Sequence, residues 1–209
     1  MKKKEIIGKI FLLISIAILF YMFINPINSI IIQYDERFTI NLLLLSWNDM
    51  WTTIFADVHP PLYYLILKGI SSIFINSGVD TVFVYKVVSI IPYILLLVVS
   101  VTKIRNDYGW FTSGLFMFTI ATMSEFFIKF LTIRMYSWGL LFLVLAFIYL
   151  KDVMDKSDTK SWALFTLFVV LAMYIHNIIL IPLGLIYVLL LVYIYVFKDN
   201  FKEELKKNG

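Results

Sequence analysis

The chain has 209 residues, of which 61% are hydrophobic and only 15% are charged. A soluble domain of this length does not need so much apolar material, so the composition indicates an integral membrane protein. The sequence has no cysteine, which excludes disulfides, thiolate nucleophiles and zinc–thiolate or iron–sulfur sites. The net charge is +4, but no part of the sequence is typical of a nucleic-acid-binding module, and we expect no nucleic acid partner.

The first apolar segment follows a basic N-terminus. Three lysines follow Met1, and the residues from Ile10 to Ile32 carry no charge. About 20 apolar residues are enough to cross the hydrocarbon core as a helix. No small-residue cleavage site follows this segment, so we predict an uncleaved first span within residues 1–32 and not a signal peptide.

The next region, residues 33–80, is mixed in character and contains one short apolar run, Leu62 to Ile75. This run is shorter than a membrane span and carries Lys68 and Gly69. Pro61 precedes it and suits the first turn of a helix, where the missing N–H costs nothing. We predict an amphipathic helix that lies on membrane lipid at the outer surface, within a large first external loop.

The rest of the sequence predicts five further spans over residues 81–197. Val82 to Thr102 forms one span, and Gly109 to Leu150 is long enough for two, with its charges in the middle, where a turn belongs. Ser161 to Phe197 is long enough for two more, with the polar pair His176–Asn177 near its midpoint. We therefore predict an all-α integral membrane protein with about six transmembrane helices and with juxtamembrane helices in the first external loop. Residues 198–209 are predicted to be a charged cytoplasmic tail.

The distribution of lysine and arginine gives the orientation. With six spans, both termini share one side of the cell membrane, and that side holds Lys2, Lys3, Lys4, Lys9, Lys103, Arg105, Lys151, Lys156, Lys160, Lys198, Lys202, Lys206 and Lys207. The other side keeps only Arg37, Lys68, Lys86, Lys129 and Arg134. Since positive charge accumulates on the cytoplasmic side, both termini are predicted to be cytoplasmic.

This topology brings ionisable residues from four separated parts of the sequence to one layer at the extracytoplasmic surface. Ionisable groups near lipid are costly to keep, so a convergent set indicates function. A transporter would instead place its polar groups near the middle of the bilayer. The residues of this layer that we predict to act on or bind a substrate are Asp35, Glu36, Asp57, His59, Tyr63, Glu125, Lys129, Arg134 and His176.

The acidic pair and the proline-rich stretch carry most of this hypothesis. Asp35 and Glu36 follow the first span, where a partly desolvated carboxylate can act as a general base toward a hydroxyl; a solvated loop is the alternative. Asp57 and His59 precede the predicted surface helix, whose N-terminal dipole favours a phosphate or a carboxylate. A rigid turn without a ligand is the alternative there. Tyr63 is suited to the headgroup level of the membrane.

The remaining residues have a functional interpretation and a structural one. Arg134 suits a guanidinium clamp for a phosphate, but a snorkelling arginine is common at the end of a span. Glu125 and Lys129 share a helical face if the turn between the spans is helical, and a surface ion pair is the alternative there. His176 is more often a satisfied interfacial histidine. A divalent metal held by His59, His176 and a carboxylate stays open, although no local ligand spacing favours it.

The order of these motifs resembles the N-terminal half of membrane glycosyltransferases with the C-type fold. The first span is followed by "YDE", the first external loop contains "DVHPPLYYLILKGISSIF", and a later span begins with "IRMYSWGLLFLVLAFIYL". These elements are similar to those of the protein O-mannosyltransferase and aminoarabinose-transferase group. The "HPPLYY" stretch is the most specific of them.

The resemblance implies inverting transfer of a sugar from a polyprenyl-phosphate donor to a protein, lipid or glycan acceptor outside the cytoplasm. Asp35 then matches the catalytic acidic residue of the family and Glu36 its partner, while His59 and Arg134 lie near the carrier phosphate. The resemblance covers nearly all of this chain but the front half of such an enzyme, so we also expect a C-terminal companion subunit. The alternative function is a non-catalytic membrane subunit, truncated or split, that binds the lipid carrier or a partner protein.

Overall fold

The structure, a computed structural model, describes residues 2–24, 26–74, 77–156 and 158–197. Throughout these residues the secondary structure is helical, as predicted, and the chain divides into two compact units, Met1–Leu141 and Phe142–Gly209. Four segments of the described chain are long and apolar enough to cross a membrane, namely Lys2–Ile24, Thr81–Thr122, Tyr136–Lys156 and Asn177–Val196. The prediction of an all-α protein is therefore confirmed for the described residues, and these four segments are consistent with an integral membrane protein.

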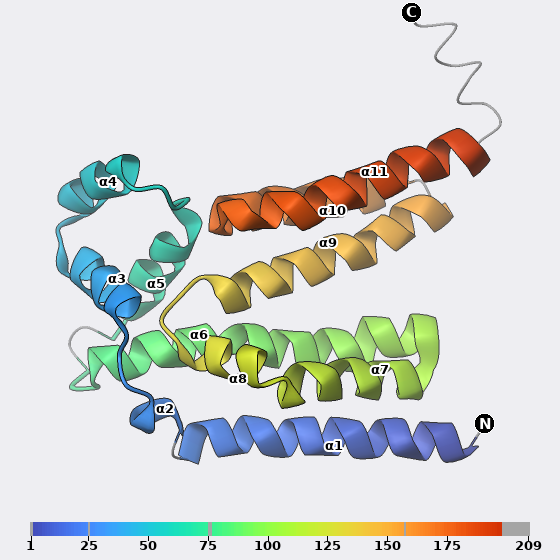
Figure 1. The fold of residues 1–209 in the computed structure, drawn as a ribbon, viewed down its shortest axis with the longest axis horizontal. Helices are drawn as coiled ribbons and strands as arrows, with labels where there is room; N and C mark the ends of the chain where they lie inside the picture. The colour runs from blue at the N-terminus through green and yellow to red at the C-terminus, as the bar shows by residue number, and fades with distance from the viewer. Residues whose placement is uncertain (1, 25, 75–76, 157, 198–209) are drawn as a thin grey trace, which may run out of the picture. The chain divides into compact units, whose positions relative to one another are not determined.

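The described chain contains long apolar helices and several short ones (Figure 1). In chain order they are α1 (Lys2–Ile24), α2 (Pro26–Ser29), α3 (Tyr34–Leu44), α4 (Trp47–Ala56), α5 (Leu62–Ser72), α6 (Thr81–Val99), a π-helical turn (Ser100–Ile104), α7 (Arg105–Thr122), α8 (Ser124–Leu131), α9 (Tyr136–Lys156), α10 (Thr159–Ile175), a 3-10 turn (Asn177–Ile179) and α11 (Leu180–Phe197). The predicted tail at residues 198–209 lies outside the described residues.

The first helix ends earlier than the sequence predicts. α1 stops at Ile24, whereas the predicted span continues to Ile32. Pro26 explains the difference, because a proline disfavours helical geometry in the residue before it and donates no hydrogen bond to the preceding turn. The chain starts the short helix α2 at this proline.

A buried lysine on α6 holds the end of α2. The ammonium group of Lys86 donates hydrogen bonds to the carbonyl oxygens of Ile27, at 2.7 Å, and Ile30, at 2.9 Å. A cation stabilises the carbonyl end of a helix because it compensates the partial negative charge there. Lys86 therefore fixes the chain between α1 and α3 against α6.

α6 and α7 form a hairpin of two long helices, so the 42-residue apolar segment Thr81–Thr122 is folded back on itself (Figure 1). The hydroxyl groups of Ser100 and Ser113 lie 2.9 Å apart across the hairpin. Between them Gly109 has a φ of +84°, which glycine adopts without the steric penalty of a side chain.

α1 packs closely on α7 because two glycines face each other. A Cβ atom on Gly114 would lie 2.0 Å from the carbonyl oxygen of Gly8, and one on Gly8 would lie 2.2 Å from the carbonyl oxygen of Trp110. Small residues at such crossings allow helix backbones to approach within membranes. The side chains of Lys9 and Arg105 lie over the Trp110 ring, 5.2 Å and 5.0 Å from its centroid.

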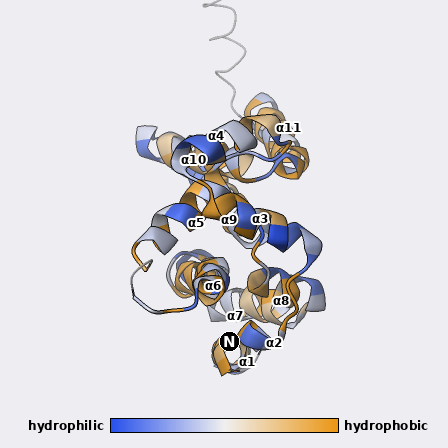
Figure 2. Ribbon diagram, turned by 90° about the vertical axis from the view of Figure 1, so that its left-hand side faces the viewer, coloured by the Kyte–Doolittle hydropathy of each residue, from blue (hydrophilic) through white to orange (hydrophobic). Residues whose placement is uncertain are grey.

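Three short helices, α3 to α5, lie at one end of α1, α6 and α7 (Figure 1). Hydrophilic residues gather on α3 and α4, whereas α1 and α6 are mostly hydrophobic (Figure 2). α5 is the short helix predicted at Leu62, and it ends at Ser72, well below the length of a membrane span. Its Lys68 donates hydrogen bonds to the carbonyl oxygens of Leu43 and Leu45, so α5 is tied to the end of α3.

α8 is a short helix that the sequence predicts only as a charged turn between two spans. It lies in the middle of the predicted pair, between the end of α7 at Thr122 and the start of α9 at Tyr136. The segment that leads from α8 into α9 is almost completely buried, and it carries Arg134.

In the second unit, α10 and α11 are separated at His176–Asn177, where the sequence predicts the break between two spans. α10 begins where the Asp158 carboxylate accepts the N–H of Ser161 at 2.7 Å. α10 has 17 residues, fewer than the other long helices, so its crossing of a membrane is not established by its length.

Candidate functional site

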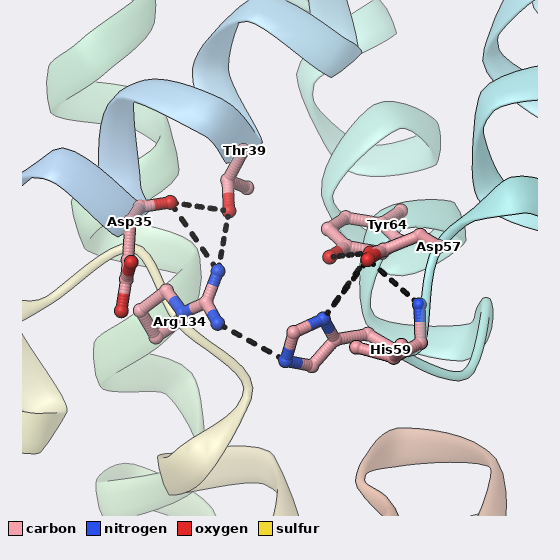
Figure 3. Close-up of polar contacts among 7 residues, drawn as sticks. Asp35, Thr39, Asp57, His59, Tyr64 and Arg134 are labelled. Carbon is pink, nitrogen blue, oxygen red and sulfur yellow. Dashed lines mark hydrogen bonds and ion pairs between the residues drawn. The ribbon is translucent and has the colours of Figure 1, made fainter.

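A pocket of about 160 Å³ in the first unit collects residues from three parts of the chain. α3 contributes its first turns, the segment between α4 and α5 contributes the residues before Pro60, and the segment between α8 and α9 contributes an arginine. The lining residues are Tyr34, Asp35, Phe38, Asp57, His59 and Arg134. Asp35, Asp57, His59 and Arg134 were predicted from the sequence, and the polar contacts among them are drawn in Figure 3.

α3 presents two kinds of side chain to this region. Tyr34 and Phe38 are four residues apart and share a helical face, as do Asp35 and Thr39. Tyr34 and Phe38 give the pocket an aromatic edge, and Asp35 lies exposed beside it. Tyr34, Phe38 and Thr39 were not predicted from the sequence, although their spacing from the acidic pair could have indicated them.

Glu36 does not line the pocket, and its side chain joins two of the segments that do. Its side chain is only 1% exposed, and each carboxylate oxygen accepts a backbone N–H. One oxygen accepts the N–H of Gln33 at 2.9 Å, and the other accepts the N–H of Ile133 at 2.7 Å. The second bond ties α3 to the segment before α9, and it sets Arg134 opposite Asp35. Glu36 is thus placed as a scaffold residue and does not line the pocket, unlike the catalytic partner that the resemblance implies.

Arg134 is a buried cation with unusually weak partners. It is 6% exposed, and its Nη1 atom donates to the Asp35 carbonyl at 3.3 Å and to the Thr39 hydroxyl at 3.4 Å. Its Nη2 atom donates to His59 at 3.4 Å, so all three contacts are longer than ordinary hydrogen bonds. Among the described residues no carboxylate forms an ion pair with Arg134, and its Nε has no hydrogen-bond partner.

A buried charge of this kind is costly unless an anion compensates it. The guanidinium is planar and offers donors in a fixed fork that matches a phosphate or a carboxylate. The pocket beside it is smaller than the about 300–1,000 Å³ of a typical small-molecule site. It therefore suits an anionic group and the atoms next to it better than a whole ligand.

His59 is held by a short chain of hydrogen bonds (Figure 3). Its Nδ1 lies 3.2 Å from an oxygen of Asp57, and the Tyr64 hydroxyl donates to that same oxygen at 3.2 Å. The backbone N–H of Val58 donates to the other oxygen at 2.8 Å. Burial, and then the negative charge of Asp57, raise the pKa of Tyr64 above its ordinary value, so the phenol remains a hydrogen-bond donor.

Other predicted site residues lie elsewhere in the first unit. Tyr63 is fully buried, and its hydroxyl contacts that of Ser89 at 3.3 Å, so it packs inside the unit and not at the pocket. Its neighbour Tyr64 reaches Asp57 instead. Glu125 is exposed on α8, and the ammonium of Lys129 lies over the Tyr136 ring at 4.5 Å; neither lines the pocket.

His176 belongs to the second unit, where it separates α10 from α11. Its Nδ1 accepts the N–H of Ile178 at 3.0 Å and so caps the 3-10 turn. Within the described ranges, no three or more histidine, aspartate or glutamate side chains gather in a way that could hold a metal ion. The metal alternative therefore gains no support from the arrangement of these side chains.

Comparisons of the chain with protein-family models, with curated proteins and with solved structures find no match. The resemblance to C-type glycosyltransferases thus rests on the sequence motifs alone.

Proposed function

We propose that the chain is a membrane glycosyltransferase module that transfers a sugar from a polyprenyl-phosphate donor to an acceptor hydroxyl outside the cytoplasm. The observation that carries this proposal is the buried Arg134 guanidinium, which lacks a carboxylate partner among the described residues and borders a pocket lined by Asp35 and His59. A cation that the protein does not neutralise supports the binding of an anionic ligand, and the diester phosphate of the donor has the required charge.

In this proposal Asp35 acts as the general base. Its carboxylate takes the proton of the acceptor hydroxyl while the hydroxyl oxygen forms a bond to the anomeric carbon. The bond from that carbon to the phosphate oxygen breaks on the opposite face, so the configuration is inverted. The electron pair stays on the phosphate, where Arg134 stabilises the additional negative charge. The exposed side chain of Asp35 is accessible to an incoming acceptor.

We also propose six membrane crossings, made by α1, α6, α7, α9, α10 and α11. Treating Thr81–Thr122 as two passes and counting α10 as one gives this number. The short helices α3 to α5 then lie outside the cytoplasm, and both termini lie inside, which agrees with the excess of lysine and arginine on the inner side.

The test is a transfer assay with purified protein, a set of polyprenyl-phosphate sugars and matched acceptors. Asp35→Asn should reduce turnover to background and leave donor binding unchanged, whereas Asp49→Asn on α4, outside the pocket, should keep full turnover. Arg134→Gln should weaken donor binding at least about 30-fold, because truncating one partner of a buried charge pair costs about 2 kcal/mol or more. If wild type and Asp35→Asn bind the donor equally and both turn over at background, the chain is a carrier-binding subunit and not an enzyme.

A further inference from the structure

The hydrogen bonds around His59 fix which of its two nitrogens carries the proton. Asp57 offers only acceptor oxygens to Nδ1, so Nδ1 must donate. The guanidinium of Arg134 offers only donors to Nε2, so Nε2 must accept. These two contacts together define the tautomer that is protonated on Nδ1, with a lone pair on Nε2 facing Arg134.

Tyr64 makes this arrangement rigid from the other side of Asp57. Its hydroxyl and the Val58 N–H occupy the Asp57 carboxylate, which leaves the imidazole in one orientation. The side chains of Asp57 and His59 are 16% and 25% exposed, so the pair is partly shielded but can still exchange protons with water. Asp57 lines the pocket and Tyr64 does not, and among the described residues neither makes a hydrogen bond to Arg134 or Asp35; Tyr64 reaches His59 through Asp57.

An anion on Arg134 conflicts with this tautomer. A phosphate oxygen at Nη2 would lie beside the Nε2 lone pair, and two acceptors repel each other. Protonation of Nε2 removes the conflict, because the imidazolium then donates to Asp57 through Nδ1 and to the phosphate through Nε2. Two flanking anions favour the charged form of a histidine, and the guanidinium opposes it.

We propose that Asp57 and Tyr64 are positioning residues that make His59 a proton-coupled ligand of the pocket, so that an anion bound to Arg134 is accompanied by uptake of one proton from water on Nε2 of His59. The inference rests on the proposed function only in taking a phosphodiester as the anion. When the sugar leaves, the phosphate gains one negative charge, and the imidazolium and the guanidinium are both placed to stabilise it.

Several charged and titratable groups contact His59 or line the same pocket. Asp57 comes from the end of α4, Tyr64 from α5, Asp35 from α3, and Arg134 from the segment before α9. Glu36 is committed to two backbone N–H groups, and Tyr64 keeps its proton because its pKa is raised. His59 takes the proton in this proposal because its Nε2 atom faces Arg134.

The first experiment is nitrogen NMR of protein labelled at histidine, and it is simple because the sequence has only two histidines. His59 should show the tautomer protonated on Nδ1. His176 should show the opposite tautomer, because its Nδ1 accepts a backbone N–H. Asp57→Asn weakens the acceptor at Nδ1 and should shift the tautomer equilibrium of His59, whereas the signature of His176, in the second unit, should be unchanged. A His59 ring protonated on Nε2 in the wild type would overturn the proposal.

The second experiment measures binding of farnesyl methyl phosphate, a phosphodiester that carries one constant charge, whereas a monoester would itself titrate near pH 6. In the wild type the dissociation constant should rise with pH, by at most tenfold per pH unit, as uptake of one proton requires. Calorimetry in two buffers of different ionisation enthalpy should find up to one proton taken up per ligand.

The variants separate positioning from a general loss of structure. Asp57→Asn should flatten the pH dependence, and Tyr64→Phe should reduce it, whereas Tyr63→Phe removes the adjacent hydroxyl and should keep the wild-type slope. Binding that is independent of pH in the wild type would overturn the relay and leave the glycosyltransferase proposal standing, since turnover with Asp35→Asn tests that proposal. The absence of any binding would contradict both.

Discussion

Glu36 offers the sharpest test of how the site is built, because its two possible roles predict different measurements. Both carboxylate oxygens accept buried or partly buried backbone N–H groups, and the bond to Ile133 joins segments 97 residues apart. A hydrogen bond to a charged group contributes about 1.5–3 kcal/mol, and a buried donor left without an acceptor costs about 1–3 kcal/mol. A scaffold role therefore predicts a large loss of stability when the carboxylate is replaced.

Glu36→Gln keeps the size of the side chain and one acceptor oxygen, but it turns an amide N–H₂ toward the other backbone donor. One bond becomes neutral and the other is lost, so we expect the free energy of unfolding to fall by about 2–4 kcal/mol. Reversible unfolding in detergent micelles, followed by tryptophan fluorescence and circular dichroism, measures this change. Farnesyl methyl phosphate binding should weaken as well, since Ile133 precedes Arg134.

Two matched variants serve as controls for the loss of stability expected of Glu36→Gln. Glu125→Gln makes the same chemical change at an exposed position on α8, and a surface substitution of this kind should alter stability by no more than about 0.5 kcal/mol. Asp35→Asn changes the exposed neighbour and should be equally mild for stability. If Glu36→Gln unfolds like the wild type and loses only sugar transfer, Glu36 is a catalytic partner and its scaffold role is wrong.

Two further predictions concern the helices. Gly114→Ala should destabilise the protein by about 1–3 kcal/mol, because its Cβ would meet the backbone of Gly8. Gly69→Ala is the control: a Cβ there has open space, so the substitution should stabilise α5 by up to about 1 kcal/mol. Equal shifts in the thermal midpoints of the two variants would refute the close crossing of α1 and α7. The hydrogen bond from the Ser161 N–H lowers the pKa of Asp158 below its ordinary 3.8. The ionised Asp158 therefore adds to the free energy of unfolding above pH 3.8, and this addition is lost as the pH falls through the pKa of Asp158 in the folded protein. The wild type should thus melt above Asp158→Asn at about pH 6, and the difference should shrink as the pH falls below 3.8; a constant difference would show that the charge plays no part.

The hydropathy of the sequence was enough to predict the helical class and the approximate positions of the long helices after residue 80. The separation of α10 from α11 at His176 was predicted because a polar pair interrupts a long apolar segment. The early end of α1 was not, since Ile27 to Ile32 is as apolar as a span and only Pro26 distinguishes it. α8 was missed because a charged turn and a short amphipathic helix have the same composition.

The convergence of Asp35, His59 and Arg134 could be predicted because the topology places their segments at one level of the helices. The partners that hold them could not. The Glu36 bond to Ile133 and the Tyr64 bond to Asp57 are set by side-chain direction, which composition and spacing along the chain do not determine.

Side-chain direction also explains why the two residues of each adjacent pair, Asp35–Glu36 and Tyr63–Tyr64, have different contacts. Neighbouring residues on a helix point about 100° apart, so one member of a pair that faces the pocket turns the other toward the packed interior. Asp35 borders the pocket while Glu36 ties α3 to Ile133, and Tyr64 reaches Asp57 while Tyr63 packs against Ser89. A doubled residue in such a motif therefore does not indicate two equivalent site residues. It indicates one residue for the site and one that fixes the helix on which the site is built, and substitutions at the two positions should separate binding from stability.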